Sequence, residues 1–175
     1  MFFSLEKSAA ALEFDRDEVL TRDFSRLLEL CRVEVFAGTG PGGQHRNRNY
    51  TAVRIIFKPS EKIVCEDASN RSQKQNMNAA LGKLRIQIAC KWRKKAPETT
   101  QYTHFNLENT NFALELAKLL DVTVSSGFDH KEAALRLGLS NSKYLKELAR
   151  LPQVWQEYQT ARKESGLPEL KLPRS

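Results

Sequence analysis

The chain has 175 residues, of which 41% are hydrophobic, and its formal net charge is +7. This size and composition predict one domain with its own core, or a small domain with an appendage, and no window is long and apolar enough to predict a membrane span. The N-terminal stretch lacks the order of a signal peptide and is too acidic for a typical transit peptide. Cys31, Cys65 and Cys90 lie far apart without a CxxC pair, which predicts reduced thiols in a cytoplasmic protein and argues against a zinc site.

The positive charge is concentrated in the middle of the chain. Residues 1–31 carry 4 basic and 7 acidic side chains, residues 32–95 carry 14 and 4, and residues 96–175 carry 10 of each. A solubilising surface explains such a concentration, but it is more typical of a face that binds a polyanion. Nucleic acid is the commonest partner of that kind.

The first predicted elements lie on both sides of a glycine-rich stretch. A capping-box pattern begins at Asp15, and apolar residues follow at helical intervals, so a helix is predicted over residues 16–31. The alternating segment 32–36 predicts a strand. After the glycine-rich stretch, the β-branched segments 51–57 and 62–67 are joined by Lys-Pro-Ser-Glu, which predicts a hairpin.

A longer helix is predicted after the hairpin. Its apolar side chains recur every three or four residues and form one stripe: Met77, Leu81, Leu84, Ile88 and Trp92. Its other faces carry cations: Lys74, Lys83, Arg85 and Lys91. The helix ends in Lys-Trp-Arg-Lys-Lys, where the helix dipole favours cations. Helix-end solvation and a share in a polyanion-binding face both explain this cluster.

The rest of the chain is neutral in charge. Residues 96–110 have no clear periodicity and predict a linker, and residues 111–175 predict a helical C-terminal segment. Four helices are expected in it, starting near Phe112, Asp129, Ser140 and Trp155.

Within this segment, residues 130–150 resemble a helix-turn-helix. Ala133, Ala134, Gly138 and Leu139 have suitable spacing for that motif. A small helical bundle with a glycine turn explains the same residues. We favour the bundle, because a neutral segment is a poor start for DNA affinity, which depends on counterion release. An appendage that binds a partner or docks on RNA is therefore expected.

The glycine-rich stretch, GTGPGGQHRNRNYTAVRI at residues 38–55, is the most informative part of the sequence. Four glycines and a proline within six residues exclude a regular helix or strand and leave the backbone open to close approach. The phosphate-loop and dinucleotide patterns both fail, because no Gly-Lys-Ser/Thr follows and no βαβ unit surrounds the stretch. Gln44 does not titrate, but its backbone N–H and side-chain amide suit orienting a water or stabilising an oxyanion. Arg46 and Arg48 suit phosphate contacts, and Tyr50 suits stacking on a base.

These residues resemble the catalytic domain of class I peptide-chain release factors and of their ribosome-rescue relatives. In that family Gly-Gly-Gln is followed by an Asn three residues later and then by Ser-Ala-Val-Arg. Here Asn47 keeps the Asn, residues 51–54 read Thr-Ala-Val-Arg, and residues 71–73 match the Arg-Ser-Gln that starts the family's long helix. The flanking strands VEVF and IVCED also match, so the resemblance covers roughly residues 30–95.

The resemblance implies an α+β fold, in which a small β-sheet packs on a long helix and a helical appendage follows. The expected organisation is an N-terminal helix at 1–31, a Gly-Gly-Gln catalytic domain at 32–95, a linker at 96–110 and a helical C-terminal segment at 111–175.

The resemblance also implies a mechanism, the hydrolysis of the ester of peptidyl-tRNA in the ribosomal peptidyl transferase centre. Gln44 would lie beside the ester carbonyl, and Gly42 and Gly43 would hold the backbone that aims its N–H at the oxyanion. The implied partners are large-subunit rRNA, peptidyl-tRNA and a glutamine methyltransferase that acts on Gln44. No metal, cofactor or membrane is expected, and the chain is expected to be a monomer. The residues expected to contact RNA are Arg46, Asn47, Arg48, Arg54, Arg71, Ser72, Gln73 and Lys74.

The sequence departs from the family in several respects. Arg46 stands where the family usually has Val, and Ala37 stands where many members have Arg. Either Arg46 and Arg48 compensate by contacting rRNA phosphate, or the loop docks differently or on a different RNA. We do not expect stop-codon recognition, because only about 30 residues precede the first predicted strand, and the C-terminal segment has too few cations to copy the basic tail of codon-independent rescue proteins. The favoured function is codon-independent translation release or ribosome rescue. The alternatives are an RNA- or ribosome-binding module that has lost release and, less favoured, a DNA-binding regulator that acts through residues 130–150.

Overall fold

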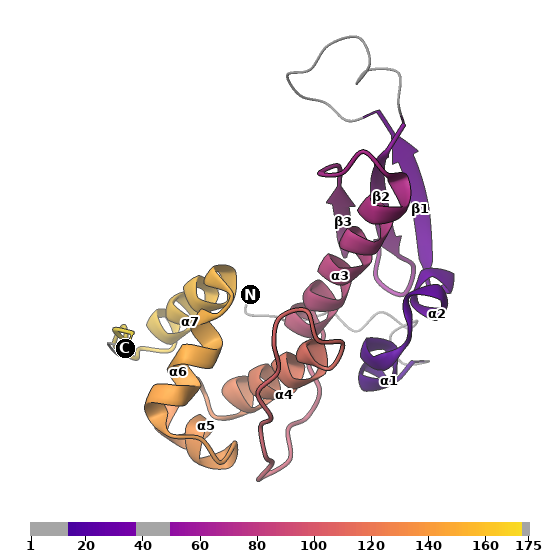
Figure 1. Ribbon diagram of the computed structural model, residues 1–175. Coiled ribbons are helices and arrows are strands. Elements are labelled where there is room, and N and C mark those ends of the chain that lie inside the picture. The colour runs from indigo at the N-terminus through magenta and orange to yellow at the C-terminus, as the bar shows by residue number, and fades with distance from the viewer. Residues whose placement is uncertain (1–13, 38–49, 173–175) are drawn as a thin grey trace. The chain divides into compact units, whose positions relative to one another are not determined.

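The computed structural model describes residues 14–37 and 50–172 (Figure 1). These residues form two compact units, which divide within one long helix. We name them the sheet unit (14–37 and 50–88) and the helical unit (89–172), and each is described by itself. No helix in the described part of the chain is both long and apolar enough to cross a bilayer.

The sheet unit contains a three-stranded antiparallel sheet in the order β1-β2-β3. Its strands are β1 (Cys31–Phe36), β2 (Ala52–Phe57) and β3 (Val64–Asp67). Val33, Ile55 and Cys65 are paired across the three strands, so their side chains share one face. The long helix α3 (Gln73–Lys91) runs along the sheet, which confirms the predicted α+β class (Figure 1).

The core of the sheet unit is built mainly from β2 and α3. Its fully buried apolar side chains include Val53, Ile55, Phe57, Ala80, Leu84 and Ile88. Burying each of the larger side chains stabilises the fold by about 1.5–3 kcal/mol. Leu81, Leu84 and Ile88 of the stripe predicted on the long helix therefore face this core. Met77 at its start is only half-buried, and Trp92 lies beyond the end of α3 and outside the sheet unit.

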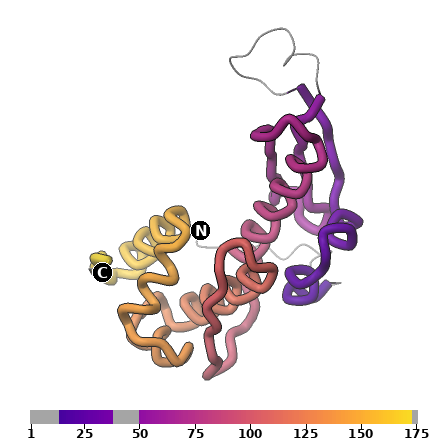
Figure 2. The backbone as a smooth tube through the Cα atoms, in the orientation of Figure 1, coloured from indigo at the N-terminus to yellow at the C-terminus, as the bar shows by residue number. Residues whose placement is uncertain are grey.

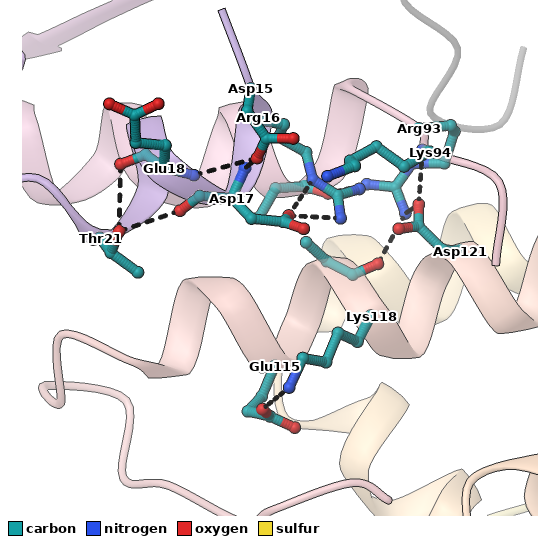
Figure 3. Close-up of polar contacts among 12 residues, drawn as sticks. Asp15, Arg16, Asp17, Glu18, Thr21, Arg93, Lys94, Glu115, Lys118 and Asp121 are labelled. Carbon is teal, nitrogen blue, oxygen red and sulfur yellow. Dashed lines mark hydrogen bonds and ion pairs between the residues drawn. The ribbon is translucent and has the colours of Figure 1, made fainter. Parts of the chain in front are cut away.

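The N-terminal residues form two short helices, α1 (Arg16–Thr21) and α2 (Phe24–Glu29). Asp15 caps the first of them as expected (Figure 3), but the single helix predicted over residues 16–31 is wrong. Arg22 has a ψ of 145°, which is extended backbone. Asp23 then starts a new helix by accepting a hydrogen bond from the backbone N–H of Arg26 at 2.9 Å. The cap at Asp23 thus divides the segment into two helices, although its apolar residues keep helical spacing across the division.

Arg85 of α3, which the sequence places on an outer face, is instead buried. Its guanidinium lies 4.7 Å from the ring centroid of Phe24 and donates a hydrogen bond to the backbone carbonyl of Arg22. Burial lowers the pKa of this guanidinium. Arg85 therefore holds α3 against the N-terminal helices and is not available to a phosphate.

The helical unit contains the four predicted helices. They are α4 (Phe112–Ser125), α5 (His130–Arg136), α6 (Asn141–Ala149) and α7 (Pro152–Glu164). Asp129 caps α5 by accepting from the backbone N–H of Lys131 at 2.8 Å, and Ser140 caps α6 by accepting from that of Lys143 at 3.2 Å. Both caps were predicted from the sequence, because each acceptor directly precedes a helical apolar pattern.

The last three helices pack as a small bundle. Gly138 has a φ of 65°, a conformation that glycine adopts without strain, and it forms the turn between α5 and α6. The buried rings of Tyr144 and Tyr158 meet edge to face, with centroids 6.3 Å apart. The hydroxyl of Tyr144 also lies 2.8 Å from that of Thr123 on α4. This packing agrees with the bundle interpretation of residues 130–150.

The segment predicted as a linker has no regular structure, but it is attached closely to the helical unit. We name residues 97–105 the strap. The N–H of Thr100 donates to the carbonyl of Arg136 at 2.8 Å, and that of Tyr102 donates to the carbonyl of Leu137 at 3.2 Å. The Arg136 side chain donates back to two strap carbonyls, those of Pro97 and Glu98. The strap is therefore part of the folded unit.

Three carboxylates of the helical unit are buried, and each has a basic partner. Glu147 accepts from Tyr102 at 2.8 Å, from His104 at 2.6 Å and from Arg150 at 2.9 Å. Burial would raise the pKa of Glu147, but these hydrogen bonds outweigh it and lower that pKa. The other two pairs, Asp121 with Arg93 at 3.1 Å and Glu115 with Lys118 at 2.5 Å, appear in Figure 3.

Candidate functional site

The central residues of the predicted site lie outside the described residues. They are Gly42, Gly43, Gln44, Arg46, Asn47 and Arg48, which belong to residues 38–49, here named the Gly-Gly-Gln segment. The structure does describe where this segment is attached. Phe36 at the end of β1 is paired with Ala52 at the start of β2, so the segment leaves and rejoins the sheet on neighbouring strands (Figure 2).

The return side of the segment is held by Asn76, a residue that sequence reasoning missed. Asn76 is fully buried on α3. Its side-chain amide donates to the backbone carbonyl of Thr51 at 2.7 Å and to that of Asn70 at 2.9 Å, and its side-chain oxygen accepts from the N–H of Asn70 at 2.8 Å. One polar side chain thus joins the start of β2 to the loop before α3. The sequence offers one signal of its burial: Asn76 lies four residues before Ala80 and therefore on the same, buried face of the helix.

The loop between β3 and α3, residues 68–72, is also held at its other end. Asp67 accepts from the backbone N–H of Ser69 at 3.0 Å and from its hydroxyl at 2.6 Å, and it pairs with Lys83 at 2.8 Å. Burial would raise the pKa of Asp67, but the contacts with Lys83 and Ser69 outweigh it and lower that pKa to about 2. The loop that carries two of the predicted RNA-contacting residues is therefore anchored at both ends.

The start of α3 presents the predicted Arg-Ser-Gln to solvent. Arg71, Ser72, Gln73 and Lys74 are all exposed. The carbonyl of Ser72 accepts from the N–H of Asn76 at 3.0 Å, which begins the helix. Arg71 and Lys74 make no ion pair with any described residue. Their charges are therefore available for an external anion.

Arg54, a further predicted RNA contact, has a different environment. It lies on β2 between a carboxylate from each neighbouring strand and donates to Glu66 at 2.5 Å and to Glu34 at 3.2 Å. These hydrogen bonds, that to Glu66 above all, raise the pKa of Arg54. Its guanidinium also lies 5.4 Å from the ring centroid of Phe36. The structure therefore gives Arg54 a cross-strand role on the exposed sheet face.

The remaining predicted contact beside the segment is Tyr50. Its side chain is 66% exposed, directly before the strand that receives the segment. An exposed aromatic ring of this size suits stacking on a base. Tyr50, Arg71 and Lys74 are thus the described residues that offer an aromatic face or a free cation near the attachment of the segment.

Comparison with known proteins assigns the family. Residues 28–114 match the family model "RF-1 domain". The chain is 32% identical to peptide chain release factor 1 of Halalkalibacterium halodurans over 113 residues, which are 64% of this chain and 30% of that protein. It is 41% identical to peptide chain release factor 1 of Bacillus cytotoxicus over 66 residues, which are 37% of this chain and 18% of that protein.

A third relative, peptide chain release factor 1 of Desulforudis audaxviator, is 38% identical over 71 residues, which are 40% of this chain and 19% of that protein. The chain therefore spans less than a third of the length of each of these relatives. The matched residues include β1, β2, β3 and α3 together with the Gly-Gly-Gln segment. The chain belongs to the family of proteins that carry the catalytic domain of class I peptide-chain release factors.

Proposed function

We propose that this protein releases nascent peptide by hydrolysing the ester of peptidyl-tRNA on the ribosome, without reading a stop codon. The observation that carries the proposal is the motif set inside the RF-1 domain match: Gly-Gly-Gln at 42–44, Asn47, and Thr-Ala-Val-Arg at 51–54. The coarser role, release-factor-like action in translation termination, is the one that the family match and the relatives' names support. Codon independence and ribosome rescue are the finer part of the proposal.

In this proposal Gln44 supplies polar groups to a reaction whose nucleophile is water. The water oxygen attacks the ester carbonyl, the bond between that carbon and the tRNA 3′-oxygen breaks, and the 3′-oxygen takes up a proton. The backbone N–H of Gln44 stabilises negative charge on the oxygens, because a donor that is aimed before the reaction costs little to reorganise. Gly42 and Gly43 permit close approach of the backbone to the substrate. The chain acts as a monomer without a metal or cofactor, and Gln44 is the proposed acceptor for a glutamine methyltransferase.

The described frame supports this role, because strand pairing and hydrogen bonds hold the backbone where the segment is attached. Neighbouring strands carry the two ends of the segment, and Asn76 and Asp67 anchor the backbone beside it. A reacting group must be held within a fraction of an ångström of its productive position. A paired strand end is a better support for such a group than a free loop.

The RNA contacts of the proposal divide into two sets. Arg46, Asn47, Arg48, Arg71, Ser72, Gln73 and Lys74 are proposed to contact the RNA of the large subunit directly. Arg71 and Lys74 are exposed and unpaired among the described residues, so they suit phosphate. Arg54 would have to exchange Glu34 or Glu66 for a phosphate, and we therefore give it a supporting place in the interface.

Codon independence is proposed because the described residues before β1 have another use. Apolar side chains of α1 and α2, such as Val19, Leu20 and Leu27, are completely buried. Arg85 of α3 is pinned to the same helices. These helices serve to cover the sheet unit, and we assign them no part in reading mRNA.

A second candidate function rests on Arg46. It places a cation beside Gln44 where the family usually has Val, and Ala37 removes a cation ahead of the segment. A protein altered in this way could bind RNA or the ribosome through the same surface without releasing peptide. This alternative predicts binding that depends on salt and on Arg46 and Arg48 but not on Gln44.

A peptide-release assay distinguishes the two functions. Ribosomes that carry labelled peptidyl-tRNA are prepared with an empty A site, a stop codon or a sense codon, and release by the full chain is followed over time. We expect release from ribosomes with an empty A site, and we expect that a stop codon does not increase the release rate. Gly43→Ala should lower the release rate by about a hundredfold, because a β-carbon restricts the backbone that aims the N–H of Gln44 and obstructs close approach. Gln44→Ala keeps that N–H and tests the contribution of the side-chain amide alone.

Gly82→Ala is the matched control for Gly43→Ala. A β-carbon at Gly82 meets no atom within 4 Å, and alanine favours a helix over glycine by about 1 kcal/mol. This variant should release peptide as fast as the wild type. Absence of release by the wild type from every ribosome, together with salt-sensitive binding, would favour the binding module instead.

A further inference from the structure

The Asn76 side chain is completely buried, although it forms no part of the hydrogen bonding within α3. It is fully buried on α3, while Asn78 two residues later is exposed. A buried amide without partners is costly, and the Asn76 side chain finds its partners in backbone outside the helix: it donates to two carbonyls and accepts from one N–H. Its placement therefore serves the backbone around it.

The backbone that Asn76 holds lies on both flanks of the predicted site. Thr51 directly precedes β2, at the point where the Gly-Gly-Gln segment rejoins the sheet. Asn70 directly precedes the exposed Arg71, Ser72 and Gln73. No other described side chain donates to the backbone of both the β1–β2 connection and the β3–α3 loop. The distances of 2.7 to 2.9 Å are those of well-formed hydrogen bonds.

We propose that Asn76 is a positioning residue for peptide release: it fixes residues 50 and 51, here named the return arm, and the Arg-Ser-Gln loop in one geometry. The proposal rests on the function proposed above. Asn76 is fully buried, so it acts through the position of Thr51, where the chain returns from the Gly-Gly-Gln segment. Loss of its two donors frees the carbonyls of Thr51 and Asn70. The arm can then move by an ångström or more, and displacements of that size can slow a reaction about a hundredfold.

The first measurement follows the position of the arm in the free protein. Spin labels are attached to Tyr50→Cys and Glu61→Cys, two exposed positions near opposite ends of β2. The native cysteines are buried, and burial raises the pKa of Cys31 and of Cys90 to about 12, so they react slowly with a thiol reagent. We expect a narrow distribution of label distances in the wild-type background and a broad one with Asn76→Ala. Asn78→Ala is the matched control on the same helix and should leave the distribution narrow.

The second measurement is peptide release by the unlabelled variants. Asn76→Ala should lower kcat by about tenfold to a hundredfold, while the protein concentration that gives half-maximal release changes less than twofold. A purely structural loss would lower the amount of active protein, and circular dichroism melts monitor that effect. If Asn76→Ala does not fold, Asn76→Ser replaces it, because the hydroxyl keeps one donor on a shorter side chain. An intermediate loss is then expected.

Three results overturn the proposal. One is a narrow label distribution in Asn76→Ala. Another is a broad distribution with an unchanged release rate. The last is a raised half-maximal concentration with an unchanged kcat, which would place Asn76 in ribosome binding. If the wild type releases no peptide at all, the proposed function fails, but the label distances still decide whether Asn76 fixes the arm.

Discussion

The two units both hold irregular segments with buried polar side chains, but they use their charges differently. In the helical unit, the buried carboxylates Asp121, Glu115 and Glu147 are each paired with a cation. In the sheet unit, a neutral amide, Asn76, holds the backbone, and the neighbouring Arg71 and Lys74 stay exposed.

The difference shows that a net charge alone does not indicate an interaction surface. The helical unit, residues 89–172, carries 13 basic and 10 acidic side chains, and several of its cations are engaged inside the fold. In the sheet unit Arg54, Lys83 and Arg85 are engaged as well. The exposed Arg71 and Lys74 remain available to a polyanion. The predictions below test this contrast, beginning with the largest expected effect on stability.

Glu147→Ala should destabilise the helical unit by about 3 kcal/mol, because it leaves the partly buried Arg150 without its carboxylate. The strap would also lose the contacts from Tyr102 and His104. The measurement is the free energy of unfolding in urea, combined with amide hydrogen exchange of residues 100 and 102. Glu164→Ala, at an exposed position of α7, is the control and should change neither. Unchanged exchange in the strap would show that Glu147 does not hold it.

Arg85→Ala should destabilise the sheet unit by about 2 kcal/mol, since it removes a buried charge-assisted hydrogen bond and the contact with the Phe24 ring. It should leave the salt dependence of ribosome binding as in the wild type, because Arg85 is buried. Urea denaturation and binding at several salt concentrations check both parts. A reduced salt dependence would mean that Arg85 contacts RNA after all.

Acid should destabilise the sheet unit through Asp67. The pKa of Asp67 is lowered from 3.8 to about 2 in the folded state, so its contribution to stability is present above 3.8 and is lost as the pH falls from about 4 to about 2. Because Lys83 is more than half exposed, solvent screens the pair and we expect a loss of about 1 kcal/mol. The urea midpoint between pH 2 and pH 6 measures it. Asp67→Asn should remove this part of the pH dependence. If the urea midpoint of this variant still fell with pH as in the wild type, Asp67 would not be the group responsible.

The double variant Arg71→Ala with Lys74→Ala should change stability by less than about 0.5 kcal/mol, because both side chains are exposed and unpaired among the described residues. Its effect should be on binding. Each lost phosphate contact lowers the slope of log affinity against log salt concentration by about 0.7–0.9. Lys143→Ala with Lys146→Ala, two exposed lysines of α6, provides the matched control. If both double variants lowered this slope equally, the cations of the two units would not differ in their availability to RNA.

Most of the secondary structure could be predicted from local patterns. The strands, the long helix and the caps at Asp129 and Ser140 follow from alternation, from helical spacing and from side-chain acceptors next to helix starts. The error over residues 16–31 has a local cause, since the cap at Asp23 outweighs an apolar spacing that continues through it.

The sequence by itself determined the family and the candidate catalytic residues, because Gly42, Gly43 and Gln44 with their flanking matches form a contiguous pattern that is readable without a fold. Only the tertiary structure decided which polar groups are available. Arg85 and Arg54 look like free cations in the sequence, but one is buried and the other lies between two carboxylates. Asn76 looks like any surface amide, yet it joins Thr51 and Asn70 across 25 and 6 residues. The physical reason is that burial and hydrogen-bond partners depend on segments distant in the chain, and these come together only when the strands and α3 pack.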